Sequence, residues 1–192
     1  MESIQFIQKL KENNLKIFSL ADIEKLLETN NSNTAYKFIQ RLIKKKLVQR
    51  LKNGLYIYSI DSSDDLQIAS FLYWPSYISL ETALNFYGIL SQFPYTITSV
   101  TPKKSKKILV NKKVFEYVHF NPEYFYGYTK EKNFLIASKE KALFDTLYLV
   151  SKGIRKIHLD ELDLSGLDRK VFYAYIEKHN FKPLKKIVEK IL

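Results

Sequence analysis

Apolar positions recur at helical spacing in three successive segments near the start of the chain. The apolar residues between positions 4 and 10 share one helical face and stop at Asn13, which predicts a first helix. A second helix is predicted after Ser19, because Asp22 completes a capping-box pattern before the next apolar run. A third is predicted over residues 33–46, with Ser32 as its N-terminal cap. A short polar turn joins the last two helices, which is the helix-turn-helix arrangement.

The third predicted helix is amphipathic in a way typical of DNA recognition. Ala35, Ile39 and Leu42 form its apolar face, and the opposite face is polar without an acidic residue. Asn and Gln side chains on that face can pair with adenine and Arg with guanine, whereas Lys side chains suit phosphates. The alternative interpretation is an ordinary solvated face. The candidate DNA-binding residues of this segment are Ser32, Asn33, Thr34, Tyr36, Lys37, Gln40, Arg41, Lys44 and Lys45.

Two β-prone runs follow this helix, at positions 47–51 and 55–58, and a turn containing Asn53-Gly54 separates them. An Asn-Gly pair between such runs predicts a tight hairpin, because both residues accept the positive φ of these turns. Three helices and a basic hairpin together predict a winged helix-turn-helix domain over residues 1–60. Arg50, Lys52 and Asn53 of the hairpin are further candidate DNA contacts. The alternative is that this domain serves only to bind another protein.

The remaining residues, 61–192, predict a second domain. An acidic, polar joint at 61–65 marks the boundary between the two. Helices are predicted at 66–74 and 79–88, and a meander-like, mainly antiparallel sheet at 96–100, 114–120, 124–128 and 134–136. A helix opened by Ser138 and two tail helices, at 169–179 and 183–191, complete the chain. The predicted fold class is therefore α+β, with a winged helix-turn-helix before helices around a small sheet, and residues 151–192 form a tail of open role.

The net charge of +11 is concentrated in two acid-free blocks. Residues 29–60 carry seven positive charges and residues 82–115 carry six, so the rest of the chain has a net charge of −2. Local binding of a polyanion explains this distribution better than general basicity does. The second block contains a predicted basic loop with three interpretations: an extension of the DNA contact, a site for an acidic partner protein, or a solvated surface. Its lysines are Lys103, Lys104, Lys106 and Lys107.

Composition and motifs argue against export and catalysis. The absence of cysteine fits a reducing, cytoplasmic location, and no apolar stretch is long enough for a membrane span or a signal peptide. The three histidines lack metal-ligand spacing and no Gly-rich phosphate loop occurs, so we expect no catalytic residue, metal or cofactor.

Two clusters of side chains in the second domain each have two interpretations. Asp160, Glu161 and Asp163 are interpreted as a solvated cluster, with a Mg²⁺ site as the alternative. The aromatic residues of positions 120–128 are interpreted as a packed strand face, with stacking on single-stranded nucleic acid as the alternative.

The order of several motifs resembles the AbiEi family of antitoxins. The similar segments are Gly54-Leu55-Tyr56, residues 78–84 with Tyr87-Gly88, Thr101-Pro102 with the basic run, residues 117–120 and, most specifically, residues 136–145. The resemblance covers roughly residues 15–150. The basic run holds lysines where we expect arginines, and the last forty or so residues match no motif of the family.

The resemblance implies one half of a bacterial toxin–antitoxin pair. In that case the N-terminal winged helix represses the shared operon by binding double-stranded operator DNA. The C-terminal domain counteracts a nucleotidyltransferase-like toxin, and this action does not require a stable complex with it. Two alternatives stay open: an ordinary winged-helix regulator with a ligand- or protein-sensing C-terminal domain, and a Mg²⁺-dependent nucleic-acid-processing enzyme at Asp160, Glu161 and Asp163.

Overall fold

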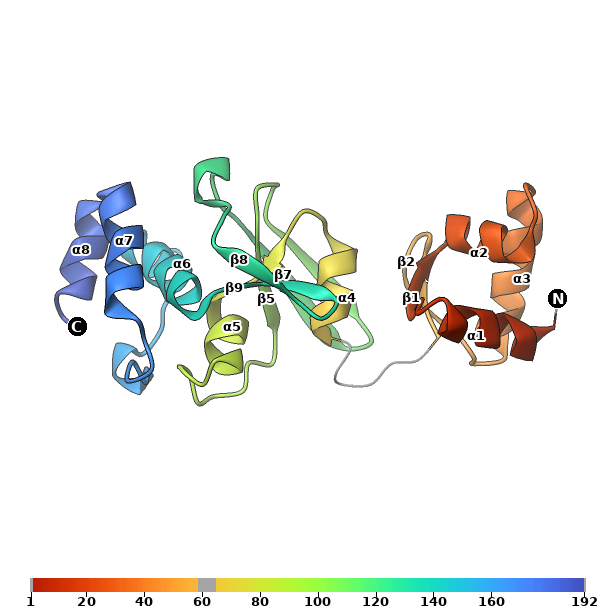
Figure 1. Ribbon diagram of the computed structural model, residues 1–192, viewed down its shortest axis with the longest axis horizontal. Coiled ribbons are helices and arrows are strands. Elements are labelled where there is room, and N and C mark those ends of the chain that lie inside the picture. Colours follow the sequence, from red (N-terminus) through yellow and green to blue (C-terminus); the bar gives the residue numbers. More distant parts are fainter. Residues whose placement is uncertain (1, 59–64, 192) are drawn as a thin grey trace. The chain divides into compact units, whose positions relative to one another are not determined.

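Two units make up the chain in the computed structural model, Met1–Leu72 and Tyr73–Leu192, and the model describes residues 2–58 and 65–191 (Figure 1). The described residues form eight α-helices and two sheets, so the protein belongs to the α+β class. The predicted boundary at residues 60 and 61, and most of the predicted acidic joint, lie outside the described residues. Asp65, the last residue of that joint, begins a helix.

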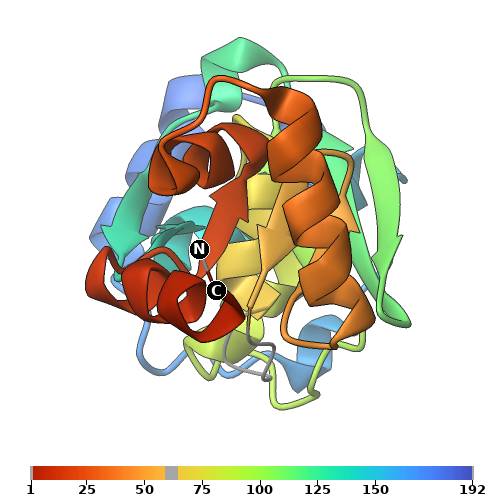
Figure 2. The same cartoon turned by 90° about the vertical axis from the view of Figure 1, so that its right-hand side faces the viewer.

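In its described residues the first unit combines four helices with three short strands. Its elements are α1 (Ser3–Glu12), β1 (Ile17–Ser19), α2 (Leu20–Leu27), α3 (Ser32–Lys44), β2 (Gln49–Lys52), β3 (Leu55–Ile57) and α4 (Asp65–Leu72). The strands form an antiparallel sheet in the order β1-β3-β2. Figure 2 shows α1, α2 and α3, in red to orange, around this sheet. The three predicted helices and the predicted hairpin are confirmed, and β1 is an additional strand.

Local hydrogen bonds explain where α2 and α3 begin. The Ser19 side chain accepts from the Asp22 amide and Asp22 accepts from the Ser19 amide, so the predicted capping box is confirmed. The cap of α3 is Asn31 and not Ser32, because the Asn31 side chain accepts from the two amides that follow Ser32. In the hairpin turn Gly54 adopts a φ of +72°, whereas Asn53 does not share the positive φ expected of it.

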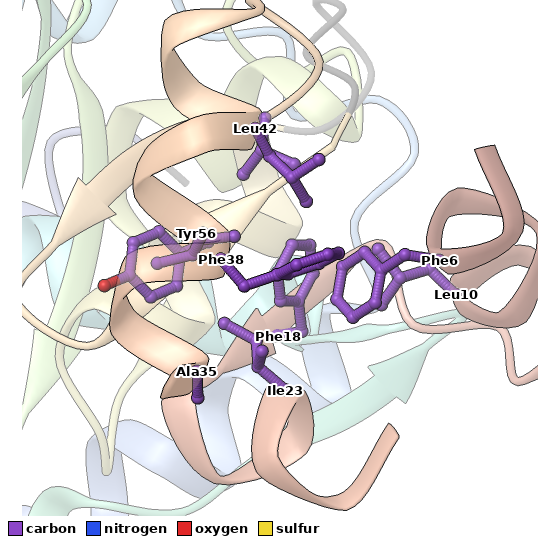
Figure 3. Packing of buried hydrophobic residues seen from close by; sticks show 10 residues of the cluster. Phe6, Leu10, Phe18, Ile23, Ala35, Phe38, Leu42 and Tyr56 are labelled. Atoms are coloured by element: carbon purple, nitrogen blue, oxygen red, sulfur yellow. The ribbon is translucent and has the colours of Figure 1, made fainter. Parts of the chain in front are cut away.

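An apolar core packs α1, α2 and α3 against the sheet of the first unit. Phe6 of α1 lies between Phe18 of β1 and Phe38 of α3, with ring centroids 6.0 and 5.1 Å away in edge-to-face geometry (Figure 3). The inward face of α3 is fully buried at Ala35, Ile39 and Leu42, as its periodicity predicts. Burial of this face leaves the opposite face of α3 as the solvent side of the helix.

The second unit contains a mixed six-stranded sheet. Its elements are β4 (Tyr77–Ile78), α5 (Leu80–Phe86), β5 (Ile97–Thr101), β6 (Lys106–Val110), β7 (Lys113–His119), β8 (Tyr128–Glu131), β9 (Phe134–Ala137), α6 (Lys139–Ser151), α7 (Arg169–His179) and α8 (Lys182–Val188). Short 3-10 turns lie at Pro122–Tyr124 and Leu159–Glu161. The strand order is β6-β7-β5-β4-β9-β8, and the pairs β5–β7 and β4–β9 are parallel.

This topology corrects the predicted meander and the predicted strand at 124–128. Two strands without a local signal, β4 and β6, enter the sheet: β4 lies between β5 and β9, and β6 lies at the edge beside β7. The segment 124–128 is mostly irregular because Pro122 opens a 3-10 turn and Gly127 has a φ of +76°, a conformation unlike that of a strand.

Helix α6 is the centre of the helical side of the second unit. All residues from Glu140 to Leu149 are buried, which is typical of a helix enclosed on every side. It packs against α5 and against both tail helices, α7 and α8. The predicted helices 169–179 and 183–191 are therefore confirmed in type, and they form part of the second unit.

Candidate nucleic-acid interface

The outward face of α3 presents cationic and amide side chains to solvent. Lys37, Arg41 and Lys44 are exposed, and Gln40 between them is partly buried. No acidic residue occurs in α3 or in the hairpin that follows it. The face therefore has a positive potential that no carboxylate of its own elements reduces.

The structure brings the predicted DNA-binding residues to two neighbouring elements. Most belong to α3, Lys45 caps its C-terminal end, Arg50 and Lys52 lie on β2, and Asn53 lies in the turn. All except Gln40 are exposed: Ser32, Asn33, Thr34, Tyr36, Lys37, Arg41, Lys44, Lys45, Arg50, Lys52 and Asn53.

Tyr56 connects the two elements. It pairs with Arg50 across the hairpin and is 2% exposed. Burial raises the pKa of Tyr56, the nearby charge of Arg50 lowers it, and Tyr36 of α3 raises it, for a net increase. Tyr56 also belongs to the same buried core cluster as the inward residues of α3. The hairpin and α3 are therefore packed on one core.

Three of the predicted cations have partners within the first unit. The Arg41 guanidinium lies 5.6 Å from the Phe38 ring centroid, and Lys45 Nζ donates to Ser3 Oγ at 3.2 Å. Lys52 Nζ donates to the carbonyls of Phe71 and Leu72, at 3.2 and 2.8 Å, where α4 ends. Lys52 is thus held at the C-terminal end of a helix, a favourable place for a cation. A phosphate contact by Lys52 requires it to leave these carbonyls.

Sequence reasoning missed a hollow of about 410 Å³ beside α3. Arg41 and Lys45 line it together with Glu2 and Ile4 from the start of α1. Ile4 is 70% exposed, although its helical spacing suggested an inward position. Nothing local in the sequence places the beginning of α1 next to the C-terminal half of α3, because this approach depends on how the core packs.

The second basic segment was predicted to be one loop, but it is divided between a loop and a strand. Lys103 and Lys104 lie in a loop, whereas Lys106 and Lys107 belong to the edge strand β6, whose pairing partner β7 follows it along the chain. All four are exposed, but Lys107 Nζ forms an ion pair with Glu116 at 3.0 Å.

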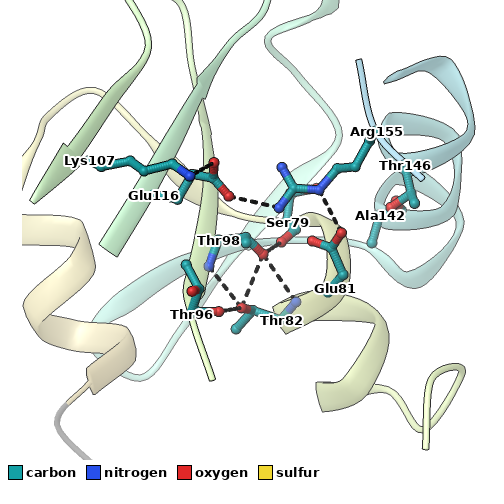
Figure 4. A network of polar contacts seen from close by, with 10 residues as sticks. All are labelled: Ser79, Glu81, Thr82, Thr96, Thr98, Lys107, Glu116, Ala142, Thr146 and Arg155. Atoms are coloured by element: carbon teal, nitrogen blue, oxygen red, sulfur yellow. Dashed lines mark hydrogen bonds and ion pairs between the residues drawn. The ribbon is translucent and has the colours of Figure 1, made fainter. Parts of the chain in front are cut away.

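Lys107 belongs to a chain of ion pairs across the second unit. Arg155 donates to Glu116 at 2.8 Å and to Glu81 at 2.5 Å, and Figure 4 shows this chain beside a cluster of threonine hydroxyls. Burial alone favours a higher pKa for Glu116, but hydrogen bonds from Arg155 and Lys107 give it a net pKa below its usual value. Lys107 is therefore already neutralised within the unit.

Helix α6 contains a buried ion pair. Lys141 and Asp145 of α6 are both 0% exposed and in direct contact. Asp145 also accepts from Tyr77 at 3.0 Å and from Ser79 at 2.8 Å. Burial lowers the pKa of Lys141 and raises that of Asp145, and the contact between the two opposes both shifts. These residues connect α6 to β4 and to the start of α5, and their spacing of four was the available sequence signal.

The acidic cluster and the aromatic run of the second unit contact residues of that unit. Among the described residues no group of three or more metal-binding side chains occurs. Glu161 instead accepts from Gln92 at 2.8 Å, and Ser165 lowers the pKa of Asp163 by hydrogen bonding to it. The aromatic residues of 120–128 pack internally: Phe120 is 1% exposed, and Tyr124 stacks on His179 at 4.2 Å. This agrees with the packed interpretation of that run, although not with its assignment to a strand.

Comparison with known proteins adds no assignment. No protein-family model matches the chain, and no curated protein matches it. Within the described part of the chain, no helix combines the length and the apolar character needed to cross a bilayer.

Proposed function

We propose that the first unit is a winged helix-turn-helix domain that binds double-stranded DNA. The observation that carries this proposal is the exposed, acid-free outward face of α3, which is followed along the chain by the basic β2–β3 hairpin. Helix α3 acts as the recognition helix and the hairpin as the wing. The 13 residues of α3 give a helix about 20 Å long, and an α-helix fits the major groove, which is about 12 Å wide.

Different side chains of α3 contact the phosphates and the bases of the DNA. Lys37 and Lys44 neutralise phosphates, which gives affinity without sequence preference. Gln40 and Arg41 lie between them on the same face, where an amide and a guanidinium can contact base edges. The amides at the start of α3 already donate to Asn31. Phosphate contacts at that end are therefore made by side chains and not by the helix N-terminus.

We further propose that the protein is an antitoxin that represses its own operon and counteracts a nucleotidyltransferase-like toxin. The support is the resemblance of ordered motifs in both units to the AbiEi family, of which residues 136–145 are the most specific. In the second unit these motif residues lie in the interior, where Lys141 and Asp145 connect α6 to the sheet. This placement gives them a structural role, so contacts with a toxin fall to the surface of the unit.

DNA binding is tested with the DNA upstream of the gene. We expect the variant Lys37→Ala/Gln40→Ala/Arg41→Ala to lose about 10- to 100-fold in affinity, because it lacks one phosphate and two base contacts. Lys11→Ala/Lys25→Ala is the matched control, since it removes exposed cations from α1 and α2. Equal mobility shifts by the wild type and the triple variant would show that the assigned face is wrong.

The antitoxin function is tested separately by co-expression with the neighbouring gene. If that gene is toxic, we expect the wild-type protein to restore growth. The triple α3 variant, tested in the same way, shows whether this rescue needs DNA binding. A failure to restore growth, with DNA binding intact, contradicts the antitoxin proposal and favours an ordinary regulator. The two halves of the proposed function are thus judged by different readouts.

A further inference from the structure

The second unit has a basic and aromatic hollow of about 700 Å³ at one edge of its sheet. Its lining residues are Tyr73, Pro102, Lys103, Lys104, Ser105 and His119. None of these described lining residues is acidic. Lys106, on the neighbouring edge strand, completes the site from the side, because its Nζ lies 5.5 Å from the Tyr73 ring centroid.

Hydrogen bonds hold the walls of the hollow together. The Tyr73 hydroxyl donates to the Lys104 carbonyl at 3.1 Å, and Lys103 Nζ donates to the Trp74 carbonyl at 2.8 Å. On the other side, His119 Nδ1 lies 2.9 Å from the Lys103 carbonyl. Because a carbonyl only accepts, Nδ1 carries a proton. The segment 73–74, the loop 103–105 and the end of β7 are therefore fixed relative to one another before any ligand binds.

The chemistry of the hollow combines cations with planar rings. The Lys103 and Lys106 ammonium groups lie 5.7 and 5.5 Å from the Tyr73 ring centroid. Trp74, the next residue, is 70% exposed, an unusual position for a large aromatic side chain. Exposed aromatic rings among cations are the combination that binds unpaired nucleotides, whose bases stack while their phosphates are neutralised.

Two features favour a polynucleotide over an acidic protein. The cations near the hollow are lysines, which act on phosphates as point charges, whereas carboxylates are gripped best by the two-pronged guanidinium of arginine. An acidic side chain also cannot stack on an exposed indole, whereas every base can. Duplex DNA hides the faces of its bases within the stack, so the rings favour single strands.

We propose that this hollow, lined by Tyr73, Lys103, Lys104 and His119, binds a single-stranded polynucleotide together with its neighbours Lys106 and Trp74. Lys104 and Lys106 neutralise its phosphates, and a base stacks on Trp74. The site belongs to the second unit and does not rest on the function proposed above.

Trp74 supplies a direct test, because it is the single tryptophan of the chain. The full-length protein is titrated with an oligothymidylate of about 12 nucleotides while the tryptophan fluorescence is followed. We expect quenching in the wild type. Lys104→Gln/Lys106→Gln is expected to bind about tenfold more weakly and to lower the salt slope by about 1.4, which corresponds to two phosphate contacts on a single strand.

The matched control is Lys130→Gln/Lys132→Gln, which removes two exposed charges at β8 and its turn. It is expected to keep the wild-type affinity, as is the triple α3 variant. Circular dichroism confirms that each variant is folded. Absence of quenching, or equal weakening by Lys130→Gln/Lys132→Gln, overturns the proposal. Equal quenching by duplex DNA, or by a polyglutamate peptide in place of the oligothymidylate, overturns the single-strand assignment in favour of that partner.

Discussion

The lysines of α3 and Lys141 of α6 carry the same ammonium group in opposite surroundings. Lys37 and Lys44 are exposed on a helix whose other face packs into the core of the first unit. Lys141 is 0% exposed, contacts Asp145, and lies 3.2 Å from the Tyr77 hydroxyl.

This difference separates charge that serves binding from charge that serves folding. An exposed ammonium is already solvated, so it can exchange water and counterions for a phosphate at little structural cost. A buried ammonium has lost its water and requires a partner at all times. The same comparison holds within the second unit, where Lys107 is paired with Glu116 while Lys104 and Lys106 border an open hollow.

The largest effect is expected from removing one partner of the buried pair. Lys141→Met leaves the Asp145 carboxylate without its cation, and we expect a loss of about 3–5 kcal/mol in the free energy of unfolding. Urea unfolding followed by the fluorescence of Trp74, which belongs to the second unit, measures this loss.

The double variant Lys141→Met/Asp145→Asn tests the same pair from the other side. Because it leaves no uncompensated charge, we expect it to recover much of the stability lost in the single variant. Lys130→Met, at an exposed position, is expected to change stability by less than about 0.5 kcal/mol. A loss below about 1 kcal/mol in Lys141→Met would show that the buried pair is dispensable.

A smaller effect is expected from the core that supports α3. Ile39 is 0% exposed on the inward face of the helix, and Ile39→Ala is expected to cost about 3 kcal/mol because it leaves a cavity. Amide hydrogen exchange in α1, α2 and α3 measures the change. Lys37→Ala, on the opposite face, is expected to leave exchange almost unchanged. Similar losses in both variants would contradict the division of α3 into a packing face and a binding face.

A still smaller effect concerns pH and His179, a titratable side chain whose partial burial lies between that of the exposed lysines and that of Lys141. Burial, followed by Lys178 and Lys141, lowers the pKa of His179 below the usual 6.5. The unfolded chain therefore binds the proton more readily, and stability conferred by the neutral ring above pH 6.5 is lost as the pH falls through the folded-state pKa.

The slope from one histidine is at most about 1.4 kcal/mol per pH unit. His179→Gln is expected to reduce the slope of urea stability against pH below 6.5, and His119→Gln serves as the control. An unchanged pH profile in His179→Gln would show that this histidine is not linked to folding.

Local signals were sufficient to predict the elements that position the α3 surface. Helical periodicity identified the inward residues of α3, and the Ser19–Asp22 pattern identified the start of α2. The Asn53-Gly54 turn between two β-prone runs identified the hairpin. Each of these signals depends on residues that are close in sequence, so a single chain is enough to read them.

The missed features depend on contacts between distant residues. Strand β4 has only two residues, and β6 contains adjacent lysines, so neither has the alternation of a half-buried strand. The hollow of the second unit joins Tyr73 to Lys104 and His119, which are far apart in the chain. The distribution of charge along the sequence identified the lysines of this hollow. That they lie beside the ring of Tyr73 follows only from the fold.

The salt dependence of duplex binding tests the central claim most directly. With about five phosphate contacts, the slope of log K against log salt should be near −4.5 for the wild type, and Lys37→Gln/Lys44→Gln should reduce its magnitude by about 1.8. Lys11→Gln/Lys25→Gln, on α1 and α2, should leave the slope unchanged. If the α3 variant keeps the wild-type slope, or if both variants reduce it equally, the outward face of α3 does not bind DNA.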